Sequence, residues 1–238
     1  AEGESLYSYY GYVADHIIET QKDADNALYD DNAIGYRNSD GKKVAGRKEI
    51  GDYEWKNRAG SDTKNGKEII DSQDQFLLGY TVPHTTGGLN NTFTYKNLSL
   101  TIYLDWALGH SIYNEQEERY FMNTFANNST LLNEVNKCWK KVGDNTKYAR
   151  FTANDADDGN RNFSRTSNIF NYKGDYLCIR EISLQYNFPY YLIKKMGISN
   201  MAVTLSGNTL YYFTAVKGVS PEVGTSSTYS DSYDNYPP

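Results

Sequence analysis

Neighbouring carboxylates, which can act as a general acid and a general base, occur at several places in this chain. Glu117 stands beside Glu118, and Asp157 stands beside Asp158 within the polar run NDADDGNRN at 154–162. A glycosidase needs two carboxylates at a set separation across a substrate cleft, and these spacings select no pair. Asp155, Asp157, Asp158 and Gly159 do not fit the template of a calcium-binding loop, which has glycine at position six. We expect a solvated loop there.

The histidines and cysteines form no catalytic or metal-binding pattern in the sequence. His16, His84 and His110 are scattered, and Cys138 and Cys178 belong to no CxxC pair. Both cysteines are therefore expected to be unpaired. The sequence contains neither the GxSxG turn of a serine hydrolase nor a glycine-rich phosphate loop. We therefore expect no enzyme activity, no bound metal and no cofactor.

The net charge and the aromatic content of the chain indicate which kinds of partner it can bind. The net charge of the chain is −6. This charge disfavours a nucleic-acid partner, because proteins that bind nucleic acids usually present a basic face to the phosphates. Tyrosine is abundant, with 23 residues against 9 phenylalanines and 3 tryptophans, and this bias suits strands and wet, sugar-facing surfaces. Tyr7, Tyr9 and Tyr10 are candidates for stacking on a ligand, and packing within a loop is the alternative.

Residues 98–108, LSLTIYLDWAL, show the clearest periodicity in the chain. Apolar and polar residues alternate along the whole run, which predicts a strand of about 35 Å at roughly 3.3 Å per residue. That length is enough to cross a tilted bilayer. The predicted lipid-facing side carries Leu98, Leu100, Ile102, Leu104, Trp106 and Leu108, and the opposite side carries Tyr103 and Asp105.

Strands are also predicted on both sides of this run. Residues 87–97 precede it and end in Lys96-Asn97, which predicts a tight two-residue hairpin turn. Residues 176–188 form a later strand whose apolar phase slips after Ile179. A β-bulge near Arg180 and Glu181 would return Ile182 and Leu184 to the apolar, lipid-facing side.

A short connection is predicted after that strand. Pro189 ends the strand because it cannot donate to the ladder, and residues 190–197 can form helical turns closed by Gly197. The next strand is expected to begin near Asn200 and to break at Gly207 and Asn208, before LYYFT at 210–214. Arg180 and Asn208 stand at the phase slips, so they are expected to point inward.

Short and very long connections alternate along the chain. The predicted strands are joined by 96–97 and 189–200, whereas long polar stretches fill 1–73, 109–175 and 215–238. This asymmetry is typical of outer-membrane barrels, which have short periplasmic turns and long outer loops. The alternative is a secreted soluble β-sandwich that binds glycans, although sandwiches distribute their loops more evenly. The sequence contains no run of 18 apolar residues, so it predicts no membrane-spanning helix.

Four stretches also resemble one protein family, the SusC/RagA-type TonB-linked outer-membrane transporters. GDYLCIREISLQYNFP at 174–189 resembles a late barrel strand of that family, and 198–224 resembles the strand that follows it. Residues 78–114 resemble the preceding hairpin, and 1–18 resemble the segment where the chain leaves an earlier strand. The likeness covers most of the chain in the family's order.

This resemblance implies an all-β fold, an antiparallel transmembrane β-barrel segment formed by late strands of a 22-stranded barrel. We expect a C-terminal part of the barrel domain that stops at 236–238, before the family's final strand, and that needs the remaining barrel and plug. The expected divisions are an outer loop region at 1–73, a hairpin at 74–108, a long outer loop at 109–175, a strand-turn-strand unit at 176–214 and a further outer loop at 215–238.

The resemblance further implies import of oligosaccharides or peptides across the bacterial cell outer membrane. A SusD-like surface lipoprotein would act as a lid, and TonB would act through an N-terminal part outside this chain. Lipid of the outer membrane would contact the apolar face. The candidate vestibule or lumen residues are Tyr7, Tyr9, Tyr10, Tyr103, Asp105, Arg180 and Asn208.

Overall fold

The structure is a computed structural model that describes residues 5, 7–30, 33, 40–42, 44–58, 63–64, 66–115, 117, 133–152 and 160–222. The chain divides into two compact units. We call the described residues within 80–112 and 172–222 the sheet unit, and those within 1–79 and 113–171 the loop unit. Within the described ranges, no helix combines the length and apolarity that crossing a membrane requires.

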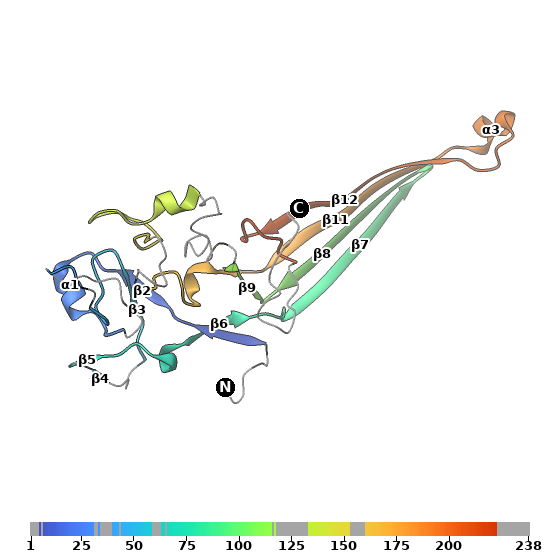
Figure 1. Cartoon of the computed structure of the whole chain (residues 1–238). Coiled ribbons are helices and arrows are strands. Elements are labelled where there is room, and N and C mark those ends of the chain that lie inside the picture. Colours follow the sequence, from blue (N-terminus) through green and yellow to red (C-terminus); the bar gives the residue numbers. More distant parts are fainter. Residues whose placement is uncertain are drawn as a thin grey trace. The chain divides into compact units, whose positions relative to one another are not determined.

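The sheet unit is built on four long antiparallel strands that lie side by side in the order β12-β11-β8-β7 (Figure 1). Each strand has 11 to 13 residues, about twice the usual length in soluble proteins. The strand predicted at 98–108 is confirmed at both ends. The bounds are Thr85–Tyr95 for β7, Leu98–Leu108 for β8, Tyr176–Asn187 for β11 and Ala202–Thr214 for β12; short β9 (Ser111–Tyr113) pairs with β10 (Asn171–Lys173).

The predicted two-residue hairpin turn between β7 and β8 is confirmed. Tyr95 pairs with Leu98, so Lys96 and Asn97 form the whole connection, and Lys96 has a φ of 53°. Positive φ in a two-residue loop matches the twist of the flanking strands. The Nδ2 of Asn97 donates to the carbonyl of Asn187 at 2.7 Å, which ties this turn to the end of β11.

The β-bulge predicted in β11 is also confirmed. Against β8 the register shifts between Ile179 and Glu181, so that Arg180 is the additional residue. Beyond the bulge, Ile182 lies opposite Ile102, and the two apolar runs of β11 share one face of the sheet. The bulge therefore restores the alternation that a regular strand would have lost.

The predicted break at Gly207 and Asn208 is wrong, because β12 runs without interruption from Ala202 to Thr214. Glu181 pairs with Asn208 and Ile179 pairs with Tyr211, so β12 absorbs its irregularity between these two pairs. Thr209 adopts a φ of 49° there, a left-handed conformation that takes up the extra length while the ladder continues on both sides.

The connection between β11 and β12 has the predicted form. Pro189 precedes the short helix α3 (Tyr190–Ile193), which continues into the 3-10 turn η4 (Lys194–Met196). Gly197 ends it with a φ of 71°, a conformation that a residue without a side chain adopts easily. Figure 1 shows α3 beyond one end of the four strands, the end at which β7 and β8 also turn.

The two faces of the sheet differ sharply in character. One face carries large apolar side chains that stand open to the surroundings, as in Phe93 with 60% and Leu205 with 74% of its surface exposed. The other face carries hydroxyl, amide and charged side chains. Further exposed apolar residues are Leu89, Leu98, Leu108, Leu177, Ile182, Leu184, Val203, Tyr211 and Phe213.

Gly87 makes room for a tryptophan on the apolar face. It lies opposite Trp106, and a Cβ built on it would be 2.3 Å from Cζ2 of the indole. We therefore expect Gly87→Ala to lower stability by about 1–3 kcal/mol, as an overpacked contact does. The check is the urea midpoint of the purified protein. Gly88→Ala is the matched control, because its Cβ would meet a Tyr103 ring atom at 3.2 Å; equal losses in both variants would contradict this account.

The loop unit contains several two-stranded pieces around an aromatic core. The core gathers Tyr53, Trp55, Phe163, Phe170 and Ile169, with Ile70, Cys138, Tyr148 and Ala149. The sequence analysis did not anticipate it, because these residues come from separate polar stretches. The elements are β1 (Ser8–Gly11) paired with β6 (Phe76–Tyr80), β2 (Ala14–Ile17) with β3 (Tyr53–Trp55), β4 (Thr63–Lys64) with β5 (Lys67–Glu68), α1 (Gln21–Asn26), η1 (Ser72–Asp74), η2 (Asn133–Lys137) and η3 (Asn168–Phe170).

Candidate functional site

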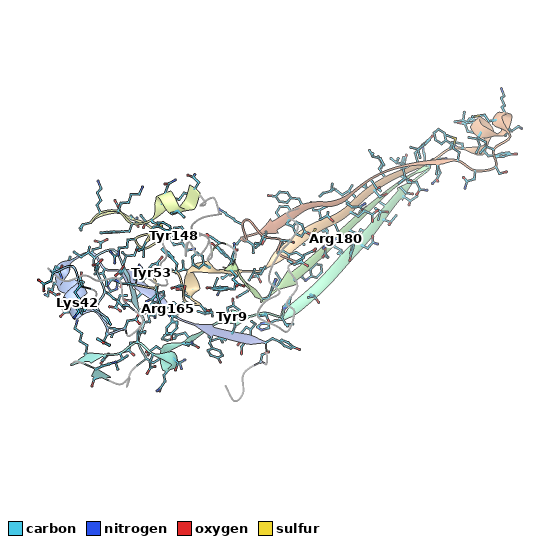
Figure 2. All side chains as sticks on the ribbon, in the orientation of Figure 1. Tyr9, Lys42, Tyr53, Tyr148, Arg165 and Arg180 are labelled. Atoms are coloured by element: carbon cyan, nitrogen blue, oxygen red, sulfur yellow. The ribbon has the colours of Figure 1, made fainter. Side chains whose placement is uncertain are left out.

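The polar face of the sheet carries the candidate site. Across the four long strands the charged residues are Asp105, Arg180 and Glu181, and Arg180 is therefore the single cation in these strands. Its guanidinium is therefore the one group in these strands that can form an ion pair with a carboxylate. Figure 2 shows Arg180 projecting from the sheet.

Asp105 and Arg180, two of the predicted lumen candidates, are brought into direct contact. The Nε of Arg180 donates to Oδ1 of Asp105 at 2.9 Å, and Nη2 donates to Oδ2 at 2.7 Å. This paired arrangement is the strongest geometry between a guanidinium and a carboxylate. The β11 bulge makes it possible, since the ladder partner of Asp105 is Cys178 and Arg180 is the additional residue next to it.

A second carboxylate, Glu222, lies on the remaining edge of the same guanidinium. Its Oε1 accepts from Nη2 of Arg180, and its Oε2 accepts from Nη1 at 3.4 Å. The Tyr212 hydroxyl is 3.5 Å from Nη1, and the tyrosine ring lies 5.9 Å from the guanidinium carbon. All three charged side chains are half-buried, so solvent still reaches the cluster.

Aromatic rings line one side of this charged cluster. Tyr176 packs edge-on against Tyr212 with ring centroids 5.8 Å apart, and His110 packs edge-on against Tyr176 at 6.4 Å. His110 is buried, and its Nε2 lies 3.5 Å from the carbonyl of Pro221. The cluster thus combines one fixed cation with flat aromatic surfaces.

The remaining lumen candidates fall into two groups. Tyr103 and Asn208 both pair with Glu181, so they form a polar row beside Arg180. Tyr7, Tyr9 and Tyr10 belong to the loop unit, where Tyr7 is exposed and the hydroxyl of Tyr9 donates to Oδ1 of Asn171. Ligand contact by any of these side chains stays a prediction.

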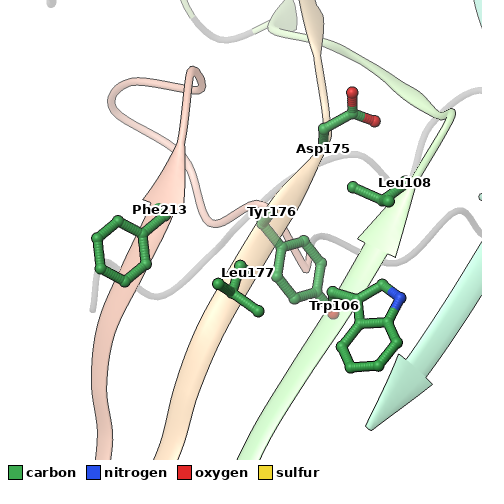
Figure 3. A pocket seen from close by; sticks show the side chains of 6 residues that line it. All are labelled: Trp106, Leu108, Asp175, Tyr176, Leu177 and Phe213. Carbon is green, nitrogen blue, oxygen red and sulfur yellow. The ribbon is translucent and has the colours of Figure 1, made fainter.

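The predicted lipid-facing residues share the other face, where a groove of about 390 Å³ lies at one end of β8 and β11 (Figure 3). Gly109 donates from its backbone to Oδ1 of Asp175 at the rim, at 2.6 Å. The groove is mainly apolar and suits an apolar chain that ends at a polar boundary. It is lined by Trp106, Leu108, Asp175, Tyr176, Leu177 and Phe213.

Glu222 was missed by sequence reasoning, although it belongs to the candidate site. It follows the last strand in a polar stretch, 42 positions after Arg180, and no periodicity links the two residues.

The carboxylate pairs considered for catalysis do not belong to the candidate site. The carboxylate of Glu117 accepts from the hydroxyl of Tyr148, and its backbone N–H donates to Oδ1 of Asn114, whereas Glu118 and 154–158 lie outside the described residues. In the described part of the chain, no three potential ligands gather as a metal site would require.

Buried ion pairs organise the loop unit. Nη2 of Arg165 donates to Oδ2 of Asp30 at 2.7 Å, and the guanidinium lies 4.9 Å from the ring of Tyr12 and 5.2 Å from that of Trp55 (Figure 2). Both charged side chains are almost fully buried. Removal of either partner would leave an uncompensated buried charge, so the pair fixes the loops in one arrangement.

Asp52 is a second buried anchor of the loop unit. It accepts hydrogen bonds from Nε of Arg150 at 2.6 Å, from Nδ2 of Asn162 at 2.9 Å and from the backbone of Glu49 at 2.7 Å. The Nδ2 of Asn160 also donates to it. Four residues from three segments donate to one carboxylate, which explains how a polar stretch of sequence holds a defined fold.

The two cysteines are free and buried, and Cys138 allows a chemical test. Burial raises the pKa of the Cys138 thiol from 9.0 to about 12, and the nearby Lys140 lowers it by less. The thiol is therefore protonated at pH 8, and we expect alkylation by iodoacetamide to be at least tenfold slower in the native protein than in urea. Because the folded pKa is raised, the stabilisation it reflects is complete below about pH 9 and is lost as pH rises toward 12. Mass spectrometry of the Cys138 peptide measures the rate; equal rates in both states would contradict the burial.

Curated proteins that resemble this chain are named TonB-dependent receptors. No protein-family model matches it. The TonB-dependent receptor P39 of Formosa agariphila is 25% identical over 94% of this chain, and the receptor P3 of the same organism is 26% identical over 66%. The chain spans about a fifth of the first relative, 22% of its length, and 15% of the second.

Solved structures agree on the fold. A structure of the RagAB peptide transporter matches 91% of this chain with a TM-score of 0.54 and 19% identity. The RagAB peptide importer in its closed-closed state matches the same share with a TM-score of 0.51 and 20% identity. Each match covers 20% of the solved chain. Along almost its whole length this chain therefore resembles TonB-dependent receptors of the SusC/RagA type, and it has the fold of a β-barrel segment in those transporters.

Proposed function

We propose that this chain forms part of the barrel wall and the outer loops of a TonB-dependent importer in the bacterial outer membrane. The observation that carries the proposal is the four-stranded sheet with 11 to 13 residues per strand, apolar and exposed on one face and polar on the other. Only strands of this length and alternation cross a bilayer without helices. In the proposal, Leu98, Leu100, Ile102, Leu104, Trp106, Leu108, Ile182 and Leu184 face lipid.

The edges of the sheet support the same proposal. β7 and β12 are the outer strands of the sheet unit, and both are long. Exposed edges of this length invite pairing with another strand, and closure into a barrel satisfies them. We therefore place the rest of a larger barrel beside these two strands. A soluble sandwich would instead cover the apolar face, which is exposed in the sheet unit.

The proposed cargo is an oligosaccharide or a peptide, which passes the polar face with Tyr103, Asp105, Arg180 and Asn208. Energy would come through TonB acting on a plug, and a SusD-like surface lipoprotein would cover the outer loops. Transport by such a device involves no covalent chemistry, which is consistent with relatives that are named as receptors and transporters.

Uptake by whole cells tests this function. Cells that carry the full-length protein would receive either a labelled peptide digest or a labelled oligosaccharide pool, with and without an uncoupler of the inner membrane. We expect one pool to accumulate only in energised cells and only when the gene is present. Uptake that is unchanged by deletion of the gene would contradict the proposal for both cargo classes.

A further inference from the structure

Arg180 is held on two edges by two carboxylates, one from a strand of the sheet and one from the segment after the last strand. Asp105 occupies the edge formed by Nε and Nη2, and it comes from the neighbouring strand of the same sheet. Glu222 occupies the edge formed by Nη1 and Nη2, and it comes from the segment that follows β12. A guanidinium offers five donors in a planar fork, so each edge can take one carboxylate independently.

The segment that carries Glu222 is buried at Val216 and again at Pro221, whereas Glu222 itself is exposed. Val216 is buried, and its backbone donates to Oγ1 of Thr214 at 3.2 Å. Farther along, Gly218 has a φ of 78°, and the backbone of Glu222 donates to Ser220 within the same turn. The contact of Pro221 with His110, at 3.5 Å, is at the long limit of a hydrogen bond.

The charge of the cluster is unbalanced when Glu222 is in place. Asp105 alone neutralises Arg180, and Glu222 then adds one negative charge to a half-buried group. Withdrawal of Glu222 would leave a balanced pair and an open Nη1–Nη2 edge. That edge is directed beside the rings of Tyr212 and Tyr176, and no other cation occurs in the four strands.

We propose that the Nη1–Nη2 edge of Arg180 binds a carboxylate of the transported ligand, and that Glu222 occupies this position when no ligand is bound. The inference rests on the proposed transport function and names the chemistry of its cargo. A carboxylate can come from a peptide, through its C-terminus or an acidic side chain, or from a uronic acid in an oligosaccharide. Both sources present the same planar group to the guanidinium.

The test compares Glu222→Gln with the wild type, both as full-length protein in detergent. The probes are acetyl-Tyr-Gly-Gly, its C-terminal amide, trigalacturonate and its methyl ester, with binding measured by titration calorimetry. Because a competing carboxylate has been removed, we expect the variant to bind one free-carboxylate probe about tenfold more tightly. Its affinity for the matching neutral probe should not change. The probe that gains affinity identifies the source of the carboxylate.

Glu181→Gln is the matched control, since it removes the same charge from the residue next to Arg180. It removes no carboxylate from the guanidinium, so it should change the affinities far less than Glu222→Gln does, and a double variant with Arg180→Gln should lose the gain of Glu222→Gln. An equal gain in Glu181→Gln, or no gain in Glu222→Gln, overturns the inference. If energised uptake persists while none of the four probes binds, the inference fails and the transport function stands. If neither uptake nor binding occurs, the function itself fails.

Discussion

An Asp30→Asn variant is expected to lose about 3–5 kcal/mol of local stability in the loop unit. Asp30 is completely buried, and the side chain of its partner Arg165 is 8% exposed. The Nε of Arg165 has no hydrogen-bond partner among the described residues, so the cation depends on Asp30 and on the rings of Tyr12 and Trp55. An isosteric amide removes the charge while keeping the shape, which isolates the electrostatic effect.

Hydrogen exchange is the suitable measurement, because it reports opening of the loops even when the strands stay folded. Backbone amides at Tyr53–Trp55 and 163–170 should exchange faster by about 100-fold or more, as an opening free energy lowered by about 3 kcal/mol requires. Asp25→Asn is the matched control, because Asp25 pairs with Arg47 at the surface, with side chains 53% and 40% exposed. Such a pair contributes at most about 1 kcal/mol. Similar exchange rates in both variants would refute the structural role of the buried pair.

An Ile102→Arg variant is expected to destabilise the membrane-inserted protein by about 2–4 kcal/mol. Ile102 lies midway along β8, opposite Ile182 of β11 and Asn91 of β7, on the apolar face. If this face contacts lipid, the guanidinium must enter the hydrocarbon near its centre, where a charge costs most. The measurement is the urea midpoint of the protein folded into lipid vesicles.

Thr101→Arg is the control for this substitution. Thr101 is adjacent on the same strand, faces the polar side and lies beside Thr92, whose hydroxyl is 3.1 Å away. A guanidinium on the polar face would remain in water, so the urea midpoint should change little. A loss at Thr101 equal to that at Ile102 would show that the two faces do not separate lipid from water.

The strands could be predicted because their cause is local. Leu98–Leu108 alternates without error, Lys96 and Asn97 stand where a hairpin must turn, and the phase slip at Arg180 required a bulge. One residue of β12 could not be predicted in this way. Thr209 adopts a left-handed conformation, which sequence patterns do not reveal for threonine, so β12 continues where a break was expected.

The core of the loop unit and half of the candidate site could not be predicted, because they depend on contacts between distant residues. Trp55 and Phe163 belong to polar stretches without periodicity, and only the fold brings their rings into one cluster. Asp105 was found because it stands on the polar side of an alternating strand, and Arg180 because it stands at a phase slip. Glu222 breaks no pattern and was therefore missed.

Site-directed spin labelling along β8 tests the central claim most directly. Labels would be placed singly at Leu100, Thr101, Ile102, Tyr103 and Leu104 in the full-length protein in lipid vesicles; both native cysteines are buried and should not react. The account predicts alternation, with even positions colliding mainly with oxygen dissolved in lipid and odd positions with a water-soluble nickel chelate. Equal access of the nickel chelate to all five positions would contradict a strand that separates lipid from an aqueous lumen.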